Sequence, residues 1–97
     1  HALYLAGAID LNFQHDVATR WRLWQRSAIK VANELREMGV NTAVDYSGKK
    51  IDKQLKSAIK SEVRYVLFVG EKELSDELYI LKDLKTGKEE RHSLQES

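Results

Sequence analysis

The sequence contains no cysteine, and this absence excludes disulfide bonds and thiolate metal sites. A chain without disulfides suits a reducing compartment, so we expect a cytoplasmic protein. The sequence also lacks any apolar run close to the ~20 residues that a membrane-spanning helix requires. Its apolar start, ALYLAGAI, lacks the basic leader of a signal peptide. We therefore expect no association with a membrane.

Motifs of common catalytic and cofactor sites are also missing. The five glycines are scattered and form neither GxGxxG nor GxxxxGK[ST], so no phosphate-binding loop is indicated. There is no Gly-x-Ser-x-Gly elbow, and His1, His15 and His92 lack the spacing of zinc ligands. His15 has two interpretations, a general base or a surface residue of a loop. The sequence therefore predicts no catalytic residue, no metal site and no cofactor.

The length and the charge distribution indicate one small domain with a basic segment. The 97 residues are 42% hydrophobic and 32% charged, which predicts a single folded domain over residues 1–97. The chain begins His-Ala rather than with Met, so we expect a fragment of a longer protein. The net charge is only +1, yet the segment from Lys49 to Arg64 has a balance of +4. Such a block can bind polyanions although the whole chain is nearly neutral.

Short segments separated by polar turns predict five strands, of which the first, LYLAGAI, is an apolar run. The third is apolar almost throughout, as expected of a central strand that is covered on both faces. The last two form an antiparallel hairpin, joined across Lys85-Thr86-Gly87-Lys88. The predicted strands span residues 3–9, 42–46, 65–69, 77–84 and 89–94. The segment between the third and fourth strands is interpreted as a polar turn.

Helical periodicity predicts a first helix from Val17 to Met38. Asp16 is its expected N-cap, and Gly39 followed by Val40 is a typical C-terminal signal. Its apolar face repeats at alternating spacings of four and three residues, through Val17, Trp21, Trp24, Ala28, Val31, Leu35 and Met38. Both tryptophans are expected to pack in the core; the alternative is stacking on nucleic-acid bases.

The segment from Gly48 to Ser61, GKKIDKQLKSAIKS, predicts a second helix with two opposite faces. One face is apolar, with Ile51, Leu55 and Ala58, and is expected to pack on a core. The other carries lysines at spacings of four, three and four residues, namely Lys49, Lys53, Lys56 and Lys60. These lysines are either a solvated surface or a grip on a negatively charged ligand.

The order β-α-β-α-β-β-β predicts an α/β fold with three layers. We expect a mixed five-stranded sheet, three parallel strands plus a C-terminal antiparallel hairpin, flanked by helices. Ligands of such sheets bind outside the carboxyl ends of the parallel strands. Asp10, Asp45 and Glu71 follow these ends, either as a carboxylate cluster or as caps and turn formers. Tyr46 also lies there, where its ring can stack on an unpaired base.

The segment from Asp45 to Glu90 resembles a known family. Its marks are the acidic residue that ends the second strand, KQLKSA in the second helix, and GEKEL after the third strand. These resemble the C-terminal anticodon-binding domain shared by histidyl, threonyl, prolyl and glycyl class II aminoacyl-tRNA synthetases. The hairpin segment LKDLKTGKEE is most similar to the histidyl branch.

The resemblance implies an anticodon-binding fold that docks the anticodon stem-loop of tRNA. The RNA-binding residues that we predict are Asp45, Tyr46, Ser47, Gly48, Lys49, Lys50, Lys53, Glu71, Glu73 and Lys82. Lys56 and Lys60 are expected to face solvent. The resemblance also implies that ATP and Mg²⁺ act only in a separate catalytic domain. The parent enzyme is expected to dimerise through that domain, and the isolated domain to be a monomer.

Three alternatives remain at the level of the sequence. The domain can belong to a threonyl, prolyl or glycyl synthetase instead of a histidyl one. It can also be a synthetase-like regulatory module that senses uncharged tRNA or contacts proteins. The third alternative is a small α/β enzyme, which would need a site built around Asp10, Asp45 and Glu71.

Overall fold

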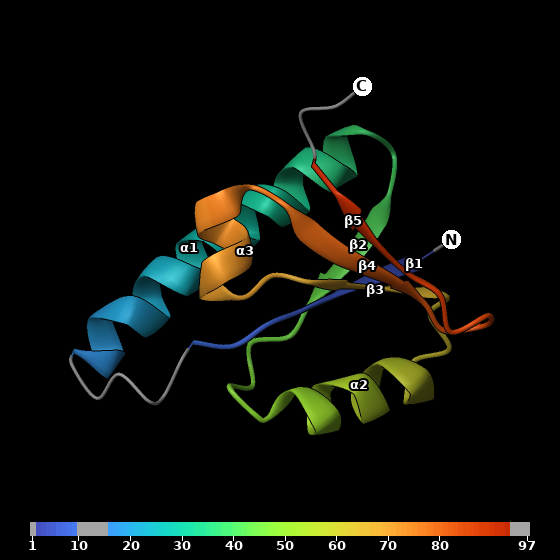
Figure 1. The fold of residues 1–97 in the computed structure, drawn as a ribbon, viewed down its shortest axis with the longest axis horizontal. Coiled ribbons are helices and arrows are strands. Elements are labelled where there is room, and N and C mark those ends of the chain that lie inside the picture. The colour runs from blue at the N-terminus through green and yellow to red at the C-terminus, as the bar shows by residue number, and fades with distance from the viewer. Residues whose placement is uncertain (1, 10–15, 94–97) are drawn as a thin grey trace.

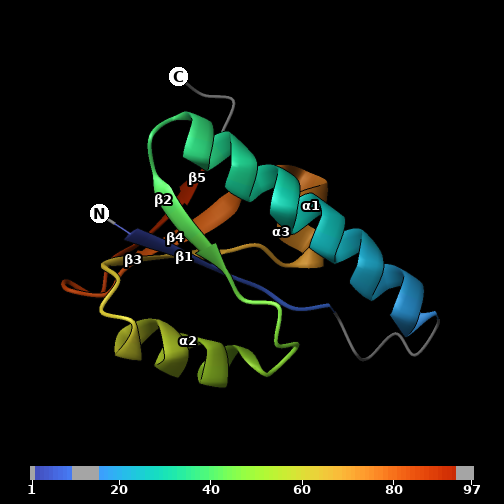
Figure 2. The ribbon, with the colours of Figure 1, turned by 180° about the vertical axis from the view of Figure 1, so that it is seen from behind.

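The computed structural model describes residues 2–9 and 16–93 (Figures 1 and 2). The predictions for Asp10 and His15 lie outside these residues. In chain order the elements are β1 (Ala2–Ala6), α1 (Val17–Glu37), β2 (Asn41–Val44), α2 (Ile51–Lys60), β3 (Tyr65–Phe68), α3 (Glu71–Asp76), β4 (Tyr79–Asp83) and β5 (Glu89–His92). Each predicted strand and helix is therefore present, with boundaries that differ by a few residues.

The five strands form one mixed sheet in the order β2-β1-β3-β4-β5. β1 lies parallel to β2 and β3, while β4 is antiparallel to both β3 and β5. Helices α1 and α3 cover one face and α2 the other, as Figures 1 and 2 show. This arrangement confirms the predicted three-layer α/β fold. The carboxyl ends of the three parallel strands lie together at one margin of the sheet, which we call the carboxyl edge (residues 7–9, 45–48 and 69–71).

The larger core lies between α1 and the sheet. The middle of the predicted apolar stripe is buried there, from Trp24, which is 1% exposed, to Leu35. The two ends of the stripe, Val17 and Met38, are exposed instead, because α1 extends beyond the sheet that covers its centre. Burial of aromatic and aliphatic side chains on this scale supplies most of the driving force for folding.

A smaller core lies between α2 and the opposite face. Ala58 packs there against Ala6 and Val66, with Leu55 partly buried beside them. The four lysines of the opposite stripe are exposed, so the predicted two-faced character of α2 is confirmed. The C-terminal prediction for α1 also holds, since Gly39 has φ of 88° and Val40 N donates to Leu35 O at 3.0 Å.

Two local predictions are wrong. Residues 71–76 form the short helix α3 instead of a polar turn, because the Glu73 carboxylate accepts a hydrogen bond from Gly70 N and so caps the helix start. Asp16 does precede α1, but its φ of 54° is left-handed and its side chain makes no cap hydrogen bond. An N-cap side chain reaches the helix amides from an extended backbone, which Asp16 does not adopt.

Candidate nucleic-acid interface

The loop from Asp45 to Lys50, here called the lysine loop, connects β2 to α2 at the carboxyl edge. It begins at a buried carboxylate: Asp45 is 7% exposed and accepts hydrogen bonds from Tyr4 OH at 2.5 Å and Ser47 N at 2.8 Å. The Ser47 hydroxyl also donates to it. These bonds fold the first residues of the loop into an Asx turn. The Asp45 side chain is thus bonded within the protein.

The Tyr4 phenol and the Asp45 carboxyl, which share a hydrogen bond, have pKa values shifted in opposite directions. Burial raises the pKa of the Asp45 carboxyl, but hydrogen bonds from Ser47 and Tyr4 outweigh it, and the net pKa lies below its ordinary value. Burial, reinforced by the bond and charge of Asp45, raises the pKa of Tyr4 from 10.0 to about 12. At neutral pH the pair is therefore a neutral phenol donating to a carboxylate.

Gln54 holds the other end of the lysine loop. It is fully buried. Its side-chain oxygen accepts a hydrogen bond from Gly7 N at 3.0 Å, and its side-chain nitrogen donates to Gly7 O at 2.9 Å and to Lys49 O at 2.6 Å. One side chain therefore ties the loop to the end of β1. Gln54 is not among the residues predicted from the sequence. The available signal was a polar side chain one helical turn before Ala58, within the apolar face of α2.

Two indoles support the loop from the α1 side of the sheet. Trp24 donates from Nε1 to Val69 O, and Trp21 stacks on Trp24 with ring centroids 5.0 Å apart and planes 8° apart. A Cβ placed on Gly48 would lie 3.5 Å from the Trp21 ring. Trp24 is a core residue, as predicted, whereas Trp21 is half-buried and packs at the margin of that core.

Cations and one aromatic ring are displayed on this scaffold. Tyr46 is 48% exposed, and Lys49, Lys50 and Lys53 are exposed around it. Within the described parts of the chain, none of these three lysines forms an ion pair. An exposed ring beside unpaired ammonium groups suits a ligand that combines flat bases with phosphates.

The other predicted RNA-binding residues lie elsewhere. Glu71 is paired with Arg20 of α1, and Glu73 caps α3; both follow β3 and are separated from the lysine loop by the end of β1. Lys82 lies within β4, opposite Val66 on the α2 face, with its ammonium 3.8 Å from a Glu89 oxygen. The structure thus places Lys53 next to the lysine loop. Glu71 and Glu73 lie apart from it at the start of α3, and Lys82 lies apart from it in β4.

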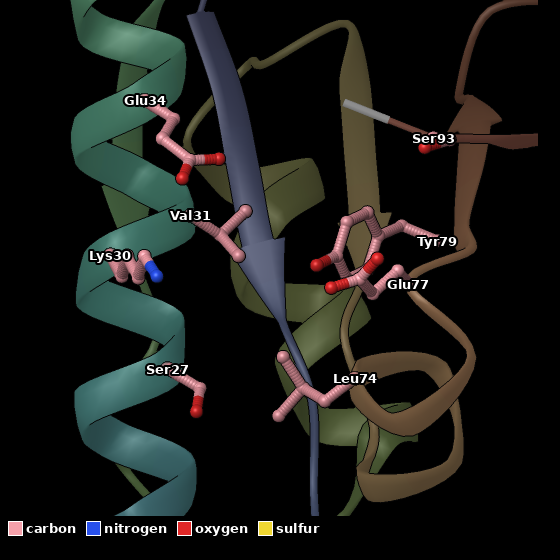
Figure 3. Close-up of a pocket in the computed structure, with 8 residues that line it drawn as sticks. All are labelled: Ser27, Lys30, Val31, Glu34, Leu74, Glu77, Tyr79 and Ser93. Carbon is pink, nitrogen blue, oxygen red and sulfur yellow. The ribbon is translucent and has the colours of Figure 1, made fainter. Parts of the chain in front are cut away.

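A cavity of about 190 Å³ opens between α1 and the α3–β4 segment (Figure 3). Glu34, Glu77 and Tyr79 line it, and Lys30 is the one cation among the described residues of its lining. Burial, with the charges of Glu34 and Glu77, raises the pKa of Tyr79. The excess of negative charge makes this cavity unsuited to a polyanion.

Residues 2–9 and 16–93 contain neither a cluster of metal ligands nor a helix that could span a membrane. No three histidine, aspartate or glutamate side chains are placed to hold a metal ion there. None of the helices in these ranges is both long and apolar enough to cross a bilayer.

Comparison with known sequences identifies relatives of this chain. The sequence model of the family described as "Anticodon binding domain" matches residues 17–97. A histidine–tRNA ligase of Pediococcus pentosaceus is 40% identical over 74 residues, which cover 76% of this chain and 18% of that protein. The histidine–tRNA ligase of Staphylococcus saprophyticus is 33% identical over 86 residues, 84% of this chain and 20% of that protein. The chain therefore spans about a fifth of the length of these relatives.

Solved structures of aminoacyl-tRNA synthetases have a fold similar to that of this chain. Apo histidyl-tRNA synthetase of S. aureus superposes with a TM-score of 0.73 at 26% identity, over 96% of this chain and 24% of that one. The RNA-binding domain of threonyl-tRNA synthetase from Cryptosporidium parvum has a TM-score of 0.72 at 21% identity, over 97% of this chain and 21% of that one. At that identity the second match shows a shared fold only.

Proposed function

The chain belongs to the anticodon-binding domain family, and we propose that it docks the anticodon stem-loop of a histidine tRNA as one domain of a histidine–tRNA ligase. The observation that carries this proposal is the lysine loop, in which an exposed tyrosine and exposed lysines stand on a buried hydrogen-bonded base. The histidine–tRNA ligases among its relatives support the choice of histidine.

The chemistry of the loop matches a single-stranded RNA target. Unpaired bases are recognised by stacking on aromatic rings and by hydrogen bonds to their edges, while cations hold the phosphates. Tyr46 supplies the ring, and Lys49 and Lys50 supply the charges, with Lys53 assisting from the first turn of α2. Glu73 and Lys82 reach the RNA only if it extends from the loop across the end of the sheet.

The reaction of the parent enzyme belongs to a different part of the protein. The chain matches only about a fifth of its relatives, so ATP and Mg²⁺ act in a catalytic domain outside it. Dimerisation is likewise assigned to that domain, and the isolated domain is a monomer in this proposal. The compartment is the cytoplasm, where charged tRNA is used.

A binding titration with synthetic stem-loops tests the proposal. The labelled anticodon stem-loop of tRNA(His) is expected to bind more tightly than a stem-loop with a scrambled anticodon. Affinity should fall as salt rises, with log K decreasing by about 0.7 to 0.9 per log unit of salt for each neutralised phosphate. Equal affinity for both RNAs at low salt would contradict anticodon recognition.

A further inference from the structure

The start of α1 contacts the lysine loop although none of its residues belongs to the predicted RNA-binding set. The Trp21 ring lies beside Gly48: a Cβ placed on this glycine would be 3.5 Å from Cζ2 and 3.6 Å from Cη2 of the indole, which is ordinary van der Waals distance. Gly48 has a φ of 70°, a left-handed conformation that glycine adopts freely. The one loop residue without a side chain is thus the one against which the indole packs.

Trp21 is itself held by a rigid partner. It stacks on Trp24, which is 1% exposed and donates from Nε1 to the carbonyl of Val69 at the end of β3. Beneath this pair lies Gly7 of the β1 end, where an added Cβ would come within 2.7 Å of the Trp24 ring. The two indoles therefore form a fixed bridge from the end of β3, over the end of β1, to the loop after β2.

Among the described residues, the centre of the loop has only a long hydrogen bond of its own, from Lys49 N to Ser47 Oγ at 3.3 Å. The first residue of the loop is fixed by the bonds of Asp45 and its end by the bond from Gln54 to Lys49 O. Gly48 lies between these two points and has the greatest backbone freedom of any residue type. If Gly48 moved between these anchors, the direction of the Lys49 side chain would vary, and RNA binding would then have to order it.

We infer that Trp21 is a positioning residue for RNA binding, which holds Gly48 so that Lys49 and Lys50 are presented in one arrangement. The inference rests on the proposed RNA-binding function of the loop. According to this inference, Trp21 acts through the loop backbone and does not itself contact RNA. The partner remains the single-stranded anticodon loop, whose phosphates the two lysines hold.

Three single variants of the 97-residue chain test the inference. Trp21→Ala is expected to weaken binding of the tRNA(His) anticodon stem-loop about tenfold, comparable to the cost of ordering one or two free side chains. Trp21→Phe keeps a ring against Gly48 and should stay within about threefold of the wild type. Leu23→Ala is the matched control, since Leu23 is 55% exposed on the same helix. It should bind as the wild type does.

A double-mutant cycle separates positioning from a general loss of packing. If Trp21 acts through the lysines, Trp21→Ala should cost little once Lys49→Ala and Lys50→Ala are present. The same change combined with Lys82→Ala should be additive, because Lys82 lies in β4, away from the loop. Additive effects with the two loop lysines would overturn the inference, as would unchanged binding by Trp21→Ala.

Amide spectra of the free protein make the two failures distinguishable. Trp21→Ala should shift and broaden the amide signals of Ser47, Gly48 and Lys49, and Leu23→Ala should leave them unchanged. Loop signals that are unaffected by Trp21→Ala overturn the inference, whatever the RNA does. Altered loop signals in a chain whose wild type does not prefer the cognate stem-loop overturn the proposed function instead.

Discussion

Two stretches at the carboxyl edge carry predicted RNA-binding residues, and their charged groups behave differently. In the lysine loop, Lys49 and Lys50 are exposed and form no ion pair with the residues that the structure describes, while backbone and buried groups provide the support. At the start of α3, Glu71 is paired with Arg20, and Glu73 caps the helix. The loop offers its charges to a ligand, whereas the α3 segment uses its charges to build the fold.

This difference shows why a sequence motif does not assign one role to all its residues. GEKEL marks the family, yet both of its glutamates are bonded inside the domain. The motif therefore has a structural explanation that needs no RNA. The lysines have a weaker structural explanation: the charge of Lys49 helps to lower the pKa of Asp45, but exposed ammonium groups contribute little to stability.

The largest expected effect removes the support of the lysine loop. Gln54→Leu leaves the buried Gly7 N–H and two carbonyl groups without their partner. Because each unsatisfied buried group costs about 1–3 kcal/mol, and water recovers a part, the free energy of unfolding should fall by about 3 kcal/mol. Urea denaturation measures this change. The control is Lys56→Leu at an exposed position of α2, which should change stability by less than about 0.5 kcal/mol.

The next effect concerns the charges of the loop. Lys49→Glu combined with Lys50→Glu replaces two attractive phosphate contacts with repulsive ones, so affinity for the stem-loop should fall about 100-fold at low salt. Lys56→Glu with Lys60→Glu makes the same change in net charge farther along α2. This control should cost tenfold or less. Equal losses in the two double variants would show that only the overall field attracts RNA.

The α3 segment gives a smaller effect, and on stability. Glu73→Ala removes the acceptor for Gly70 N and should lower the free energy of unfolding by about 1 kcal/mol, whereas Glu73→Gln keeps an acceptor and should cost less than half of that. Thermal unfolding of both variants measures the difference. If Glu73→Ala instead weakens RNA binding strongly at unchanged stability, the glutamate contacts RNA and the contrast between the two stretches fails.

The smallest expected effect is a dependence on alkaline pH. The pKa of Tyr4 is raised from 10.0 to about 12, so the folded state favours the neutral phenol. Its contribution to stability is complete below pH 10 and is lost as the pH rises toward 12. Tyr4→Phe should reduce this alkaline loss without abolishing it, since the pKa of Tyr79 is raised as well. Urea midpoints measured between about pH 9 and 11 test the prediction.

Much of the fold was predictable because periodicity reports burial. Apolar spacing predicted α1 and α2, and nearly continuous apolar runs predicted β1 and β3. The helix α3 was not predictable in this way. It has six residues with Leu74 as their one apolar side chain, and its start depends on the Glu73 cap and on the Arg20–Glu71 pair. Arg20 comes from a distant part of the chain, which local patterns do not report.

The candidate site was predictable only in part, for a related reason. Exposure of Tyr46 and of the loop lysines agrees with what turn position and charge spacing suggested. The supports of the loop depend on contacts between elements. Gln54 bonds the end of β1, and Trp21 packs on Gly48 across the sheet edge. A single sequence can show a polar residue within an apolar helix face, as it does for Gln54, but it does not show which tertiary partner that residue contacts.

Chemical-shift mapping with RNA tests the central claim most directly. The ¹⁵N-labelled chain would be titrated with the tRNA(His) anticodon stem-loop and, separately, with a scrambled loop on the same stem. We predict that the cognate loop gives its largest amide shifts at Tyr46, Lys49, Lys50 and Lys53, with smaller shifts from the scrambled loop. Largest shifts outside the lysine loop and the first turn of α2, or equal shifts from both RNAs, would contradict the account.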